Sequence, residues 1–185
     1  MKLLMFGYPG SGKGTAAACF CEKHKEYVHI STGDMLRKEI SEETELGKQA
    51  KHYIDQGHLV PDDLISQIVL DTVKKYDNLI LDGFPRTVPQ AKFLHNNIKF
   101  DAMLWLFAKK EAIIKRMLNR GRKDDSESII KERIKIYEEE TYAVAGYYLR
   151  DTDVPVLHIN SEGSIDNMMK DIYSQINELN LSISS

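Results

Sequence analysis

The chain has few cysteines, and this restricts both the disulfides it can form and the compartments in which we expect it. Only Cys19 and Cys21 occur among the 185 residues. Both fall in a stretch expected to be helical, where residues two positions apart face different directions and cannot form an ordinary disulfide. The sequence therefore lacks the disulfide framework that would indicate an oxidising compartment, and we expect a cytoplasmic protein.

The chain also lacks long apolar runs and an excess of basic charge. Its longest apolar runs, such as residues 103–108, are far shorter than the roughly 20 residues that span a bilayer. The apolar residues 3–6 lead straight into a glycine-rich loop and do not resemble a signal peptide. The net charge is −3, and the basic residues are spread along the chain rather than gathered in tails. We therefore expect no membrane and no nucleic acid as partner, but a small anionic molecule.

That glycine-rich loop lies between an apolar run and a helix-favouring run of alanines. Residues 7–15 are Gly-Tyr-Pro-Gly-Ser-Gly-Lys-Gly-Thr. Glycines let backbone N–H groups wrap around a phosphate, the following helix adds its positive end, and Lys13 adds a mobile positive charge. The segment therefore predicts a phosphate-binding loop. It departs from the usual P-loop pattern in one respect, because Gly14 stands between Lys13 and Thr15.

Short apolar runs alternate with helical patterns along the chain. The runs cover residues 3–6, 27–30, 79–81, 103–107 and 154–159. Runs that are apolar on both faces and separated by ten or more helical residues are typical of a parallel sheet covered by helices on both sides. We predict one doubly wound α/β domain over residues 1–185, with a five-stranded parallel sheet.

Two connections are predicted to carry extra structure. Nearly fifty residues separate the second and third runs, too many for one crossover, and they show helical patterns at 33–40, 44–56 and 62–75. Residues 31–60 are therefore predicted to form an inserted helical subdomain. Two further helices, at 111–120 and 126–150, are joined by residues 121–125, which form a candidate lid.

Arginine is used sparingly. The chain has seven arginines against eighteen lysines. Six of the seven fall where they should converge on the loop side of the sheet: Arg37, Arg86, Arg116, Arg120, Arg122 and Arg133. Arginine grips phosphate with paired hydrogen bonds, so this distribution favours a phosphoryl-transfer site. Any single arginine is equally well explained as a solvated surface residue, whereas the set is not.

Two aspartates are candidates for holding a magnesium ion. Asp82 follows the third apolar run, at the carboxyl end of a strand, where ligands of open α/β sheets bind. There it could hold Mg²⁺ against nucleotide phosphates, directly or through water, or it could simply form a turn. Asp34 could do the same, or it could cap its own helix.

These motifs together resemble the adenylate kinases, and the resemblance covers essentially the whole chain. The matching motifs are residues 7–15 with the Gly-Lys-Gly-Thr ending, 31–37 (Ser-Thr-Gly-Asp-Met-Leu-Arg), 57–62 (Gly-His-Leu-Val-Pro-Asp), 82–87 (Asp-Gly-Phe-Pro-Arg-Thr) with Gln90, 120–125 (Arg-Gly-Arg-Lys-Asp-Asp), and Arg133. The resemblance implies a P-loop fold with a helical NMP-binding insertion and a very short lid. It also implies a reversible, magnesium-dependent transfer of the terminal phosphate of ATP to AMP, giving two ADP and serving adenine nucleotide homeostasis.

The resemblance further implies a role for each matching residue. ATP would be held by Gly10, Ser11, Gly12, Lys13, Gly14, Thr15, Arg116, Arg120 and the backbone of Gly163. AMP would be held by Thr32, Arg37, His58, Leu59, Val60, Gly83, Phe84, Pro85, Arg86 and Gln90. Arg122 and Arg133 would clamp the phosphates where the transfer occurs, and Lys13, Arg86, Arg120, Arg122 and Arg133 would be the catalytic residues. His58 is expected to contribute its backbone rather than its ring.

Other readings stay open on the sequence alone. A UMP, CMP or GMP kinase is the alternative within the same class, although Thr32 and Gln90 match the AMP-selective members of the family. A nucleotide-dependent switch is the alternative from another class, but Arg37 and Arg86 would then have no second nucleotide to hold. The lid contains neither Cys nor His, so no zinc site is expected. The family resemblance leads us to expect a monomer.

Overall fold

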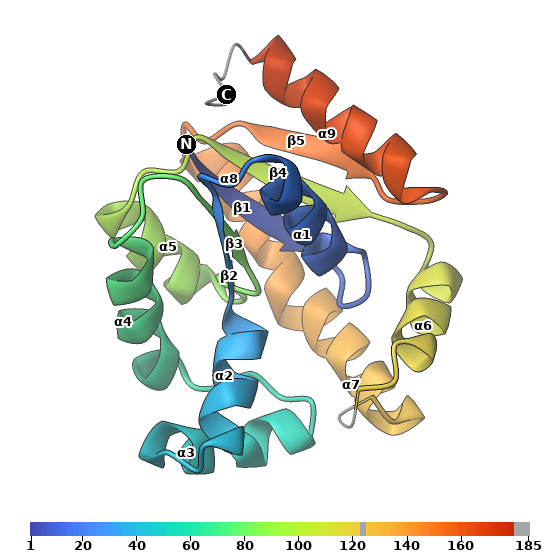
Figure 1. Cartoon of the computed structure of the whole chain (residues 1–185). Helices are drawn as coiled ribbons and strands as arrows, with labels where there is room; N and C mark the ends of the chain where they lie inside the picture. The colour runs from blue at the N-terminus through green and yellow to red at the C-terminus, as the bar shows by residue number, and fades with distance from the viewer. Residues whose placement is uncertain (123–124, 180–185) are drawn as a thin grey trace.

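The sheet has five parallel strands, as the apolar runs predict. The computed structural model describes residues 1–122 and 125–179. Its strands are β1 (Lys2–Gly7), β2 (Val28–Ser31), β3 (Leu79–Asp82), β4 (Ala102–Phe107) and β5 (Val156–Asn160). They lie in the order β2-β3-β1-β4-β5 (Figure 1), and β1 in the centre pairs Leu4 with Leu81 on one side and Met103 on the other. The carboxyl ends of all five strands therefore meet at one edge of the sheet.

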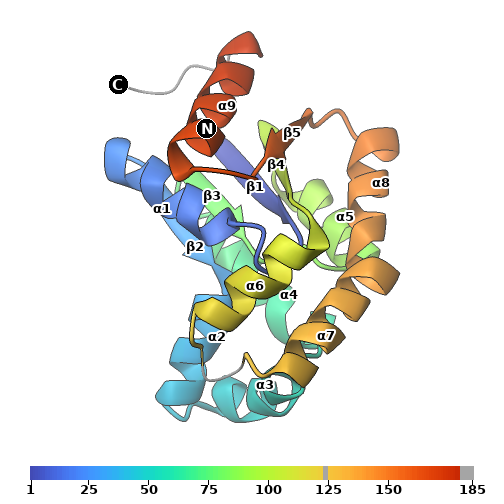
Figure 2. The ribbon, with the colours of Figure 1, turned by 90° about the vertical axis from the view of Figure 1, so that its right-hand side faces the viewer.

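Helices cover both faces of this sheet because successive residues of a strand point to opposite sides. On one face, Leu3 and Met5 pack with helices α1 (Lys13–Lys23) and α9 (Ile165–Glu178). On the other face, Leu4 and Phe6 pack in a second apolar cluster. Its helices are α4 (Asp62–Val73), α5 (Val88–Asn97) and α8 (Tyr142–Asp151). Figure 2 shows α1 and α9 on one side of the strands and α5 and α8 on the other.

The segment between β2 and β3 contains two helices beyond the edge of the sheet and one on its face. Helices α2 (Thr32–Ser41) and α3 (Glu45–Asp55) pack on each other below the strand ends (Figure 1). They approach closely at Gly47, where an added Cβ would lie 2.1 Å from the carbonyl oxygen of Glu39. The third predicted helical pattern, now α4, covers the sheet instead. That residues 31–60 act as a separate AMP-binding unit stays a prediction.

The two helices predicted after β4 are both present, and the second contains a π-helical turn. Helix α6 is Lys110–Asn119, α7 is Glu127–Ile136, and a π-helical turn, Tyr137–Thr141, separates α7 from α8. The helix predicted over 126–150 is therefore present as one helical run without a break, with a π-helical turn inside it. The turn buries Tyr137 against Phe6 and Tyr8, a contact that periodicity along one helix does not reveal. Residues 123 and 124 of the predicted lid lie outside the described residues.

Helices α6 and α7 form a pair through their own apolar contacts. Ile113 and Met117 of α6 are fully buried against Ile130 and Ile134 of α7. This pair lies over the phosphate loop, because Gly10 is so close to α6 that an added Cβ would lie 2.6 Å from Met117 Cγ. Within the described residues, no helix has the length and apolar character needed to cross a bilayer.

Candidate functional site

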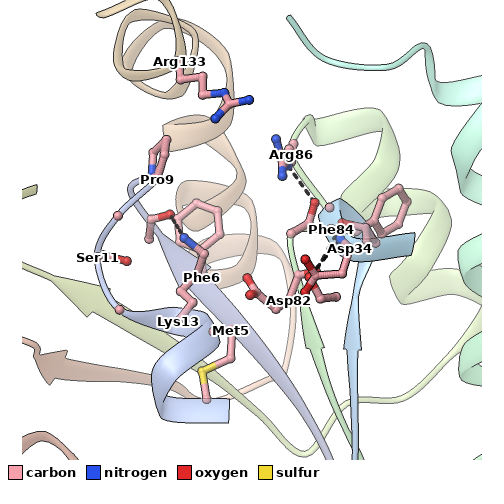
Figure 3. Close-up of a pocket in the computed structure, with 18 of the residues that line it drawn as sticks. Met5, Phe6, Pro9, Ser11, Lys13, Asp34, Asp82, Phe84, Arg86 and Arg133 are labelled. Atoms are coloured by element: carbon pink, nitrogen blue, oxygen red, sulfur yellow. Dashed lines mark hydrogen bonds between the residues drawn. The ribbon is translucent and has the colours of Figure 1, made fainter. Parts of the chain in front are cut away.

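One large cleft opens at the carboxyl ends of the strands. It has a volume of about 1040 Å³, and every residue that the sequence singled out as a candidate lines it. Figure 3 shows the phosphate loop with Ser11 and Lys13 on one side of this cleft, and Asp34, Asp82 and Arg86 across from it. Arg133 reaches the same space from α7 (Figure 3). The sheet edge, the α2–α3 segment and the α6–α7 pair thus contribute to a single cleft.

The phosphate loop has the backbone geometry that its glycines permit. Gly7 has φ +136°, and a Cβ there would lie 2.2 Å from the carbonyl oxygen of Leu106, so no other residue fits. Gly12 is the left-handed N-cap of α1 and supplies no side chain to cap the first turn. The first N–H groups of α1 are therefore left for a ligand, at the positive end of the helix. The hydroxyl of Ser11 is buried and has no hydrogen-bond partner among residues 1–122 and 125–179.

Lys13 folds back over its own loop. Its Nζ donates to the carbonyl oxygens of Gly7 and Tyr8, each at 2.8 Å. Burial lowers the pKa of Lys13 to about 8, and the negative charge of Asp82 offsets only part of this effect. The ammonium group is therefore a charge that this site tolerates poorly without an anion beside it.

Asp82 ends β3 next to the start of α1. A Cβ added to Gly14 would lie 3.7 Å from Asp82 Oδ2, and the ring of His29 on β2 has its Nε2 3.7 Å from the same oxygen. Burial works to raise the pKa of Asp82, but His29 and Lys13 outweigh it, so that the pKa lies below the ordinary value. Asp82 is therefore a carboxylate at neutral pH, with its side chain 14% exposed.

At the start of α2, one residue caps the helix and two neighbouring candidates have other hydrogen-bond partners. The N-cap is Ser31, whose hydroxyl accepts a hydrogen bond from the backbone N–H of Asp34. Thr32 is therefore not the cap: it is 2% exposed, and its hydroxyl donates to the carbonyl oxygen of Asp82 at 3.2 Å. Asp34 is not the cap either, because its carboxylate accepts a hydrogen bond from Arg37.

The turn after β3 fixes two more polar groups. The peptide bond between Phe84 and Pro85 is cis. Arg86 Nε donates to the carbonyl oxygen of Gly83 at 2.7 Å, and the backbone N–H of Arg86 donates to Gln90 Oε1 at 2.7 Å. Gln90 is 3% exposed at the start of α5, yet it lines the cleft. Its side chain is held by the protein rather than left to find a partner.

The arginines of α6 and α7 are tied together by one carboxylate. The side chain of Asp125 is 1% exposed and accepts hydrogen bonds from Arg120 Nη2 at 2.8 Å and from Arg133 Nη1 at 2.9 Å. Arg116, one helical turn before Arg120, donates to the carbonyl oxygen of Ser161 at 2.7 Å. Asp125 lies in the motif recognised in the sequence, but its part in holding these arginines was not predicted. Only the folding of α6 against α7 brings the three groups together.

Positive charge is concentrated where these helices approach α2. Burial and the neighbouring Arg120 and Arg37 all lower the pKa of Arg122, while Asp34 acts in the opposite direction. An arginine stays charged despite such a shift, because its ordinary pKa is above about 12. The cleft therefore has an excess of cationic groups in this region, as binding of several phosphates would require.

The α3–α4 connection also contacts α7 across the cleft. A Cβ on Gly57 would lie 3.1 Å from Ile129 Cγ2, and His58 Nε2 lies 3.7 Å from Glu132 Oε1. The backbone N–H of His58 is already bonded to the carbonyl oxygen of Tyr53. For His58, the carbonyl oxygen is thus the backbone group left to a ligand, while its ring faces Glu132.

Other lining residues were not expected from the sequence. His29, Ile54, Tyr137, Thr141 and Met168 line the cleft without belonging to any recognised motif. The seventh arginine, Arg150 on α8, does not line it. No group of three or more His, Cys, Asp or Glu side chains suited to a metal occurs in the part of the chain that the structure describes. Cys19 and Cys21 are both free thiols.

Comparison with known proteins identifies a single family. The family model described as adenylate kinase matches residues 5–153. An adenylate kinase of Bacteroides fragilis is 41% identical over 191 aligned positions, covering 97% of this chain and all of that protein. An adenylate kinase of Corynebacterium urealyticum is 40% identical over 176 positions, covering 91% of this chain and 94% of the relative. A third, from Nocardia farcinica, is 40% identical over 174 positions.

Proposed function

Because the chain belongs to the adenylate kinase family and is an ATP:AMP phosphotransferase, we propose that the large cleft holds two nucleotides with their phosphates meeting between Lys13 and Arg86. The placement of cationic groups on opposite sides of one cleft of about 1040 Å³ carries this proposal, because Lys13 lies on one side and Arg86 across from it (Figure 3). The phosphate loop lines this cleft, and so do the polar side chains of Thr32 and Gln90.

The donor, ATP, belongs at the phosphate loop in this proposal. The uncapped first turn of α1 and the buried hydroxyl of Ser11 are donors suited to phosphate oxygens. Lys13 would leave its two carbonyl partners for the phosphates, with Arg116 and Arg120 beside them. The loop around Gly163, between β5 and α9, would accept the adenine of ATP.

The acceptor, AMP, belongs at the opposite side. Thr32 and Gln90 would face its base, as would the backbone of residues 58–60 and 83–85, and Arg37 and Arg86 would hold its phosphate. Arg122 and Arg133 would bridge the two nucleotides. The attacking phosphate oxygen of AMP is already an anion, so the protein needs to supply position and positive charge rather than a general base.

Magnesium accompanies ATP in adenylate kinases as a general property. Mg²⁺ in such sites keeps several waters and takes one or two carboxylates besides the phosphates, so the lack of a three-ligand group among the described residues is compatible with it. Asp82 fits this role, because it is ionised and lies beside the first turn of α1. Asp34 has one oxygen bonded to Arg37, which leaves the other for a water of the ion. The ion would neutralise phosphate charge.

We further propose that the protein is a monomer in the cytoplasm and that it holds no zinc. Large apolar side chains that are exposed lie on several separate helices, for example Leu118 on α6, Leu149 on α8 and Ile165 on α9, which supports a monomer. Light scattering coupled to gel filtration tests it, because a dimer would double the mass from 21.2 kDa.

A coupled assay of ADP formation tests the reaction itself. The purified protein is given ATP with AMP, UMP, CMP or GMP in turn, and activity confined to AMP is expected. Preference for a pyrimidine nucleotide would contradict the acceptor assignment. Equilibrium dialysis with a non-hydrolysable ATP analogue and AMP should find two sites, whereas a single nucleotide site would favour a switch.

A further inference from the structure

Both ends of the side-chain amide of Gln90 are hydrogen-bonded, one to a group that can only donate and the other to a group that can only accept. Its Oε1 accepts the backbone N–H of Arg86 at 2.7 Å, and its Nε2 donates to Asp62 Oδ1 at 2.6 Å. The other oxygen of Asp62 accepts a hydrogen bond from the hydroxyl of Thr87 at 3.2 Å, and this hydroxyl accepts one from the backbone N–H of Gln90 at 3.3 Å. The four groups form a closed network.

The partners determine which way round the amide of Gln90 lies. A backbone N–H can only donate, and a carboxylate can only accept. Turning the amide over would set its NH₂ against the N–H of Arg86 and its oxygen against Asp62, at the cost of two hydrogen bonds and of two unfavourable contacts. Gln90 is 3% exposed, so water does not compensate. One orientation is therefore strongly favoured.

This orientation leaves one donor and one acceptor for a ligand. The NH₂ of Gln90 has a second hydrogen and its oxygen a second lone pair, and the residue lines the cleft. Adenine offers an amino donor beside a ring-nitrogen acceptor, whereas hypoxanthine offers a carbonyl acceptor beside a ring N–H donor. The two edges have opposite patterns of donor and acceptor. An amide held in the orientation that hydrogen-bonds to adenine therefore cannot form the corresponding pair of hydrogen bonds with hypoxanthine.

We propose that Asp62 is a positioning residue for acceptor specificity, which fixes the amide of Gln90 so that it recognises adenine and rejects hypoxanthine. This inference rests on the proposed function, in which AMP is the acceptor and Gln90 faces its base. Asp62 itself is not among the described residues that line the cleft. It borders a separate depression behind Gln90, together with Asp63 and Phe93, and thus acts through Gln90 rather than on the base.

Asp62 also has a structural part that the experiment must separate. It lies in the first turn of α4, where a negative charge favours the helix, and it touches Thr87, the N-cap of α5. Asp63 offers a matched control, because it occupies the same first turn, carries the same charge and is exposed. Loss of helix stability should affect Asp62→Asn and Asp63→Asn alike, whereas loss of the Gln90 contact affects only the former.

The test compares AMP with IMP as acceptor, using kcat and KM for each in the full-length wild type, Asp62→Asn and Asp63→Asn. The amide introduced by Asp62→Asn can donate as well as accept, so it removes one of the two penalties for reversing Gln90. The ratio of kcat/KM for AMP over IMP should fall about tenfold, the equivalent of one hydrogen bond of about 1.4 kcal/mol. The change should lie in KM, with kcat for AMP within about twofold, because the phosphates are not touched.

A second variant guards against a folding failure of the first. Asp62→Ala removes both carboxylate oxygens and should shift the ratio in the same direction, while Asp63→Asn leaves it unchanged. An unaltered ratio in a folded Asp62 variant, or an equal shift in Asp63→Asn, would overturn the proposal. A wild type that does not phosphorylate AMP at all would instead contradict the proposed function, so that the two failures are distinguishable.

Discussion

The groups proposed to face a base and the groups proposed to face phosphates are held in different ways. At the proposed acceptor end, neutral groups are fixed by partners they can keep: Thr32 on the carbonyl oxygen of Asp82, and Gln90 between Asp62 and a backbone N–H. The cations rest on acceptors that a phosphate can replace, as Arg86 rests on the carbonyl oxygen of Gly83, and those of the proposed donor end do the same. Lys13 lies on two carbonyl oxygens of its own loop, and Arg120 lies on Asp125.

The difference follows from what each end must distinguish. A base is recognised by the pattern of donors and acceptors on its edge, so the groups that read it must be fixed before it arrives. A phosphate is recognised by charge, and an unpartnered buried cation would be costly in its absence. Temporary acceptors within the protein keep these cations satisfied until the phosphates take their place.

The largest effect is expected from removing Lys13, the cation at the proposed donor end. Lys13→Met should lower kcat/KM on the order of 10²- to 10³-fold, because a preorganised positive charge beside the transferring phosphate is lost. The fold should be retained, since Met fills similar space and frees two carbonyl oxygens at an open cleft. Lys170→Met, at an exposed position of α9, is the control and should leave turnover unchanged. A near-normal rate in Lys13→Met would remove Lys13 from the proposed machinery.

At the acceptor end, a neutral group should affect recognition rather than turnover. Thr32→Ala should raise KM for AMP about tenfold, the equivalent of one lost hydrogen bond, with KM for ATP and kcat little changed. Steady-state kinetics with each nucleotide varied in turn measure this. Ser31→Ala is the matched control: it removes the N-cap of α2 and should lower the free energy of unfolding by about 1 kcal/mol, with KM unaffected. Equal KM effects in both variants would mean that Thr32 acts only through the helix.

The donor end should also respond to pH, whereas the acceptor end should not. The pKa of Lys13 is lowered to about 8 in the ligand-free protein, and a bound phosphate raises it again. The charged form binds ATP, so affinity is complete below pH 8 and falls as pH rises through 8, by at most about tenfold per unit. Calorimetry at pH 8.5 in buffers of different ionisation enthalpy should show proton uptake on binding of ATP and none attributable to Lys13 on binding of AMP. Lys13→Arg should abolish the uptake.

The sheet and its phosphate loop were predictable because their signals are local. Apolar runs such as 79–81 give the strands, and the glycines of 7–15 give the turn into α1. Five parallel strands with helices on both sides were confirmed. The helix predicted over 126–150 was also correct, but the π-helical turn inside it was missed, because Tyr137 of this turn packs on residues more than 125 positions away in the sequence.

The supporting groups of the cleft were less predictable than the groups they support. The residue types and spacing of the arginines and glycines predict phosphate binding without knowledge of the fold. Asp62 and Asp125 are acidic residues near helix ends, which by sequence alone are as consistent with helix-dipole interactions as with the holding of Gln90 or Arg120. Only contacts between separate elements reveal these roles, and such contacts carry no local pattern.

The smallest effect is expected where the phosphate loop meets the π-helical turn. The ring of Tyr8 packs on Tyr137 at 4.0 Å between centroids, while its hydroxyl donates to Glu138 Oε1 at 3.2 Å and its carbonyl oxygen accepts from Lys13. Tyr8→Ala should raise KM for ATP a few-fold, since an aromatic pair contributes about 0.5–1.5 kcal/mol and its loss frees the loop that positions Lys13.

Two variants decide whether the ring or the hydroxyl of Tyr8 matters. Tyr8→Phe keeps the ring contact and loses one exposed hydrogen bond, so KM for ATP should stay within about twofold of the wild type. Tyr142→Ala removes another tyrosine near Tyr137, 52% exposed and outside the loop, and should leave KM for ATP unchanged. If Tyr8→Phe weakened ATP binding as much as Tyr8→Ala, the hydrogen bond to Glu138 would anchor the loop. If KM for AMP rose equally in Tyr8→Ala, the separation between donor and acceptor ends would fail at this point.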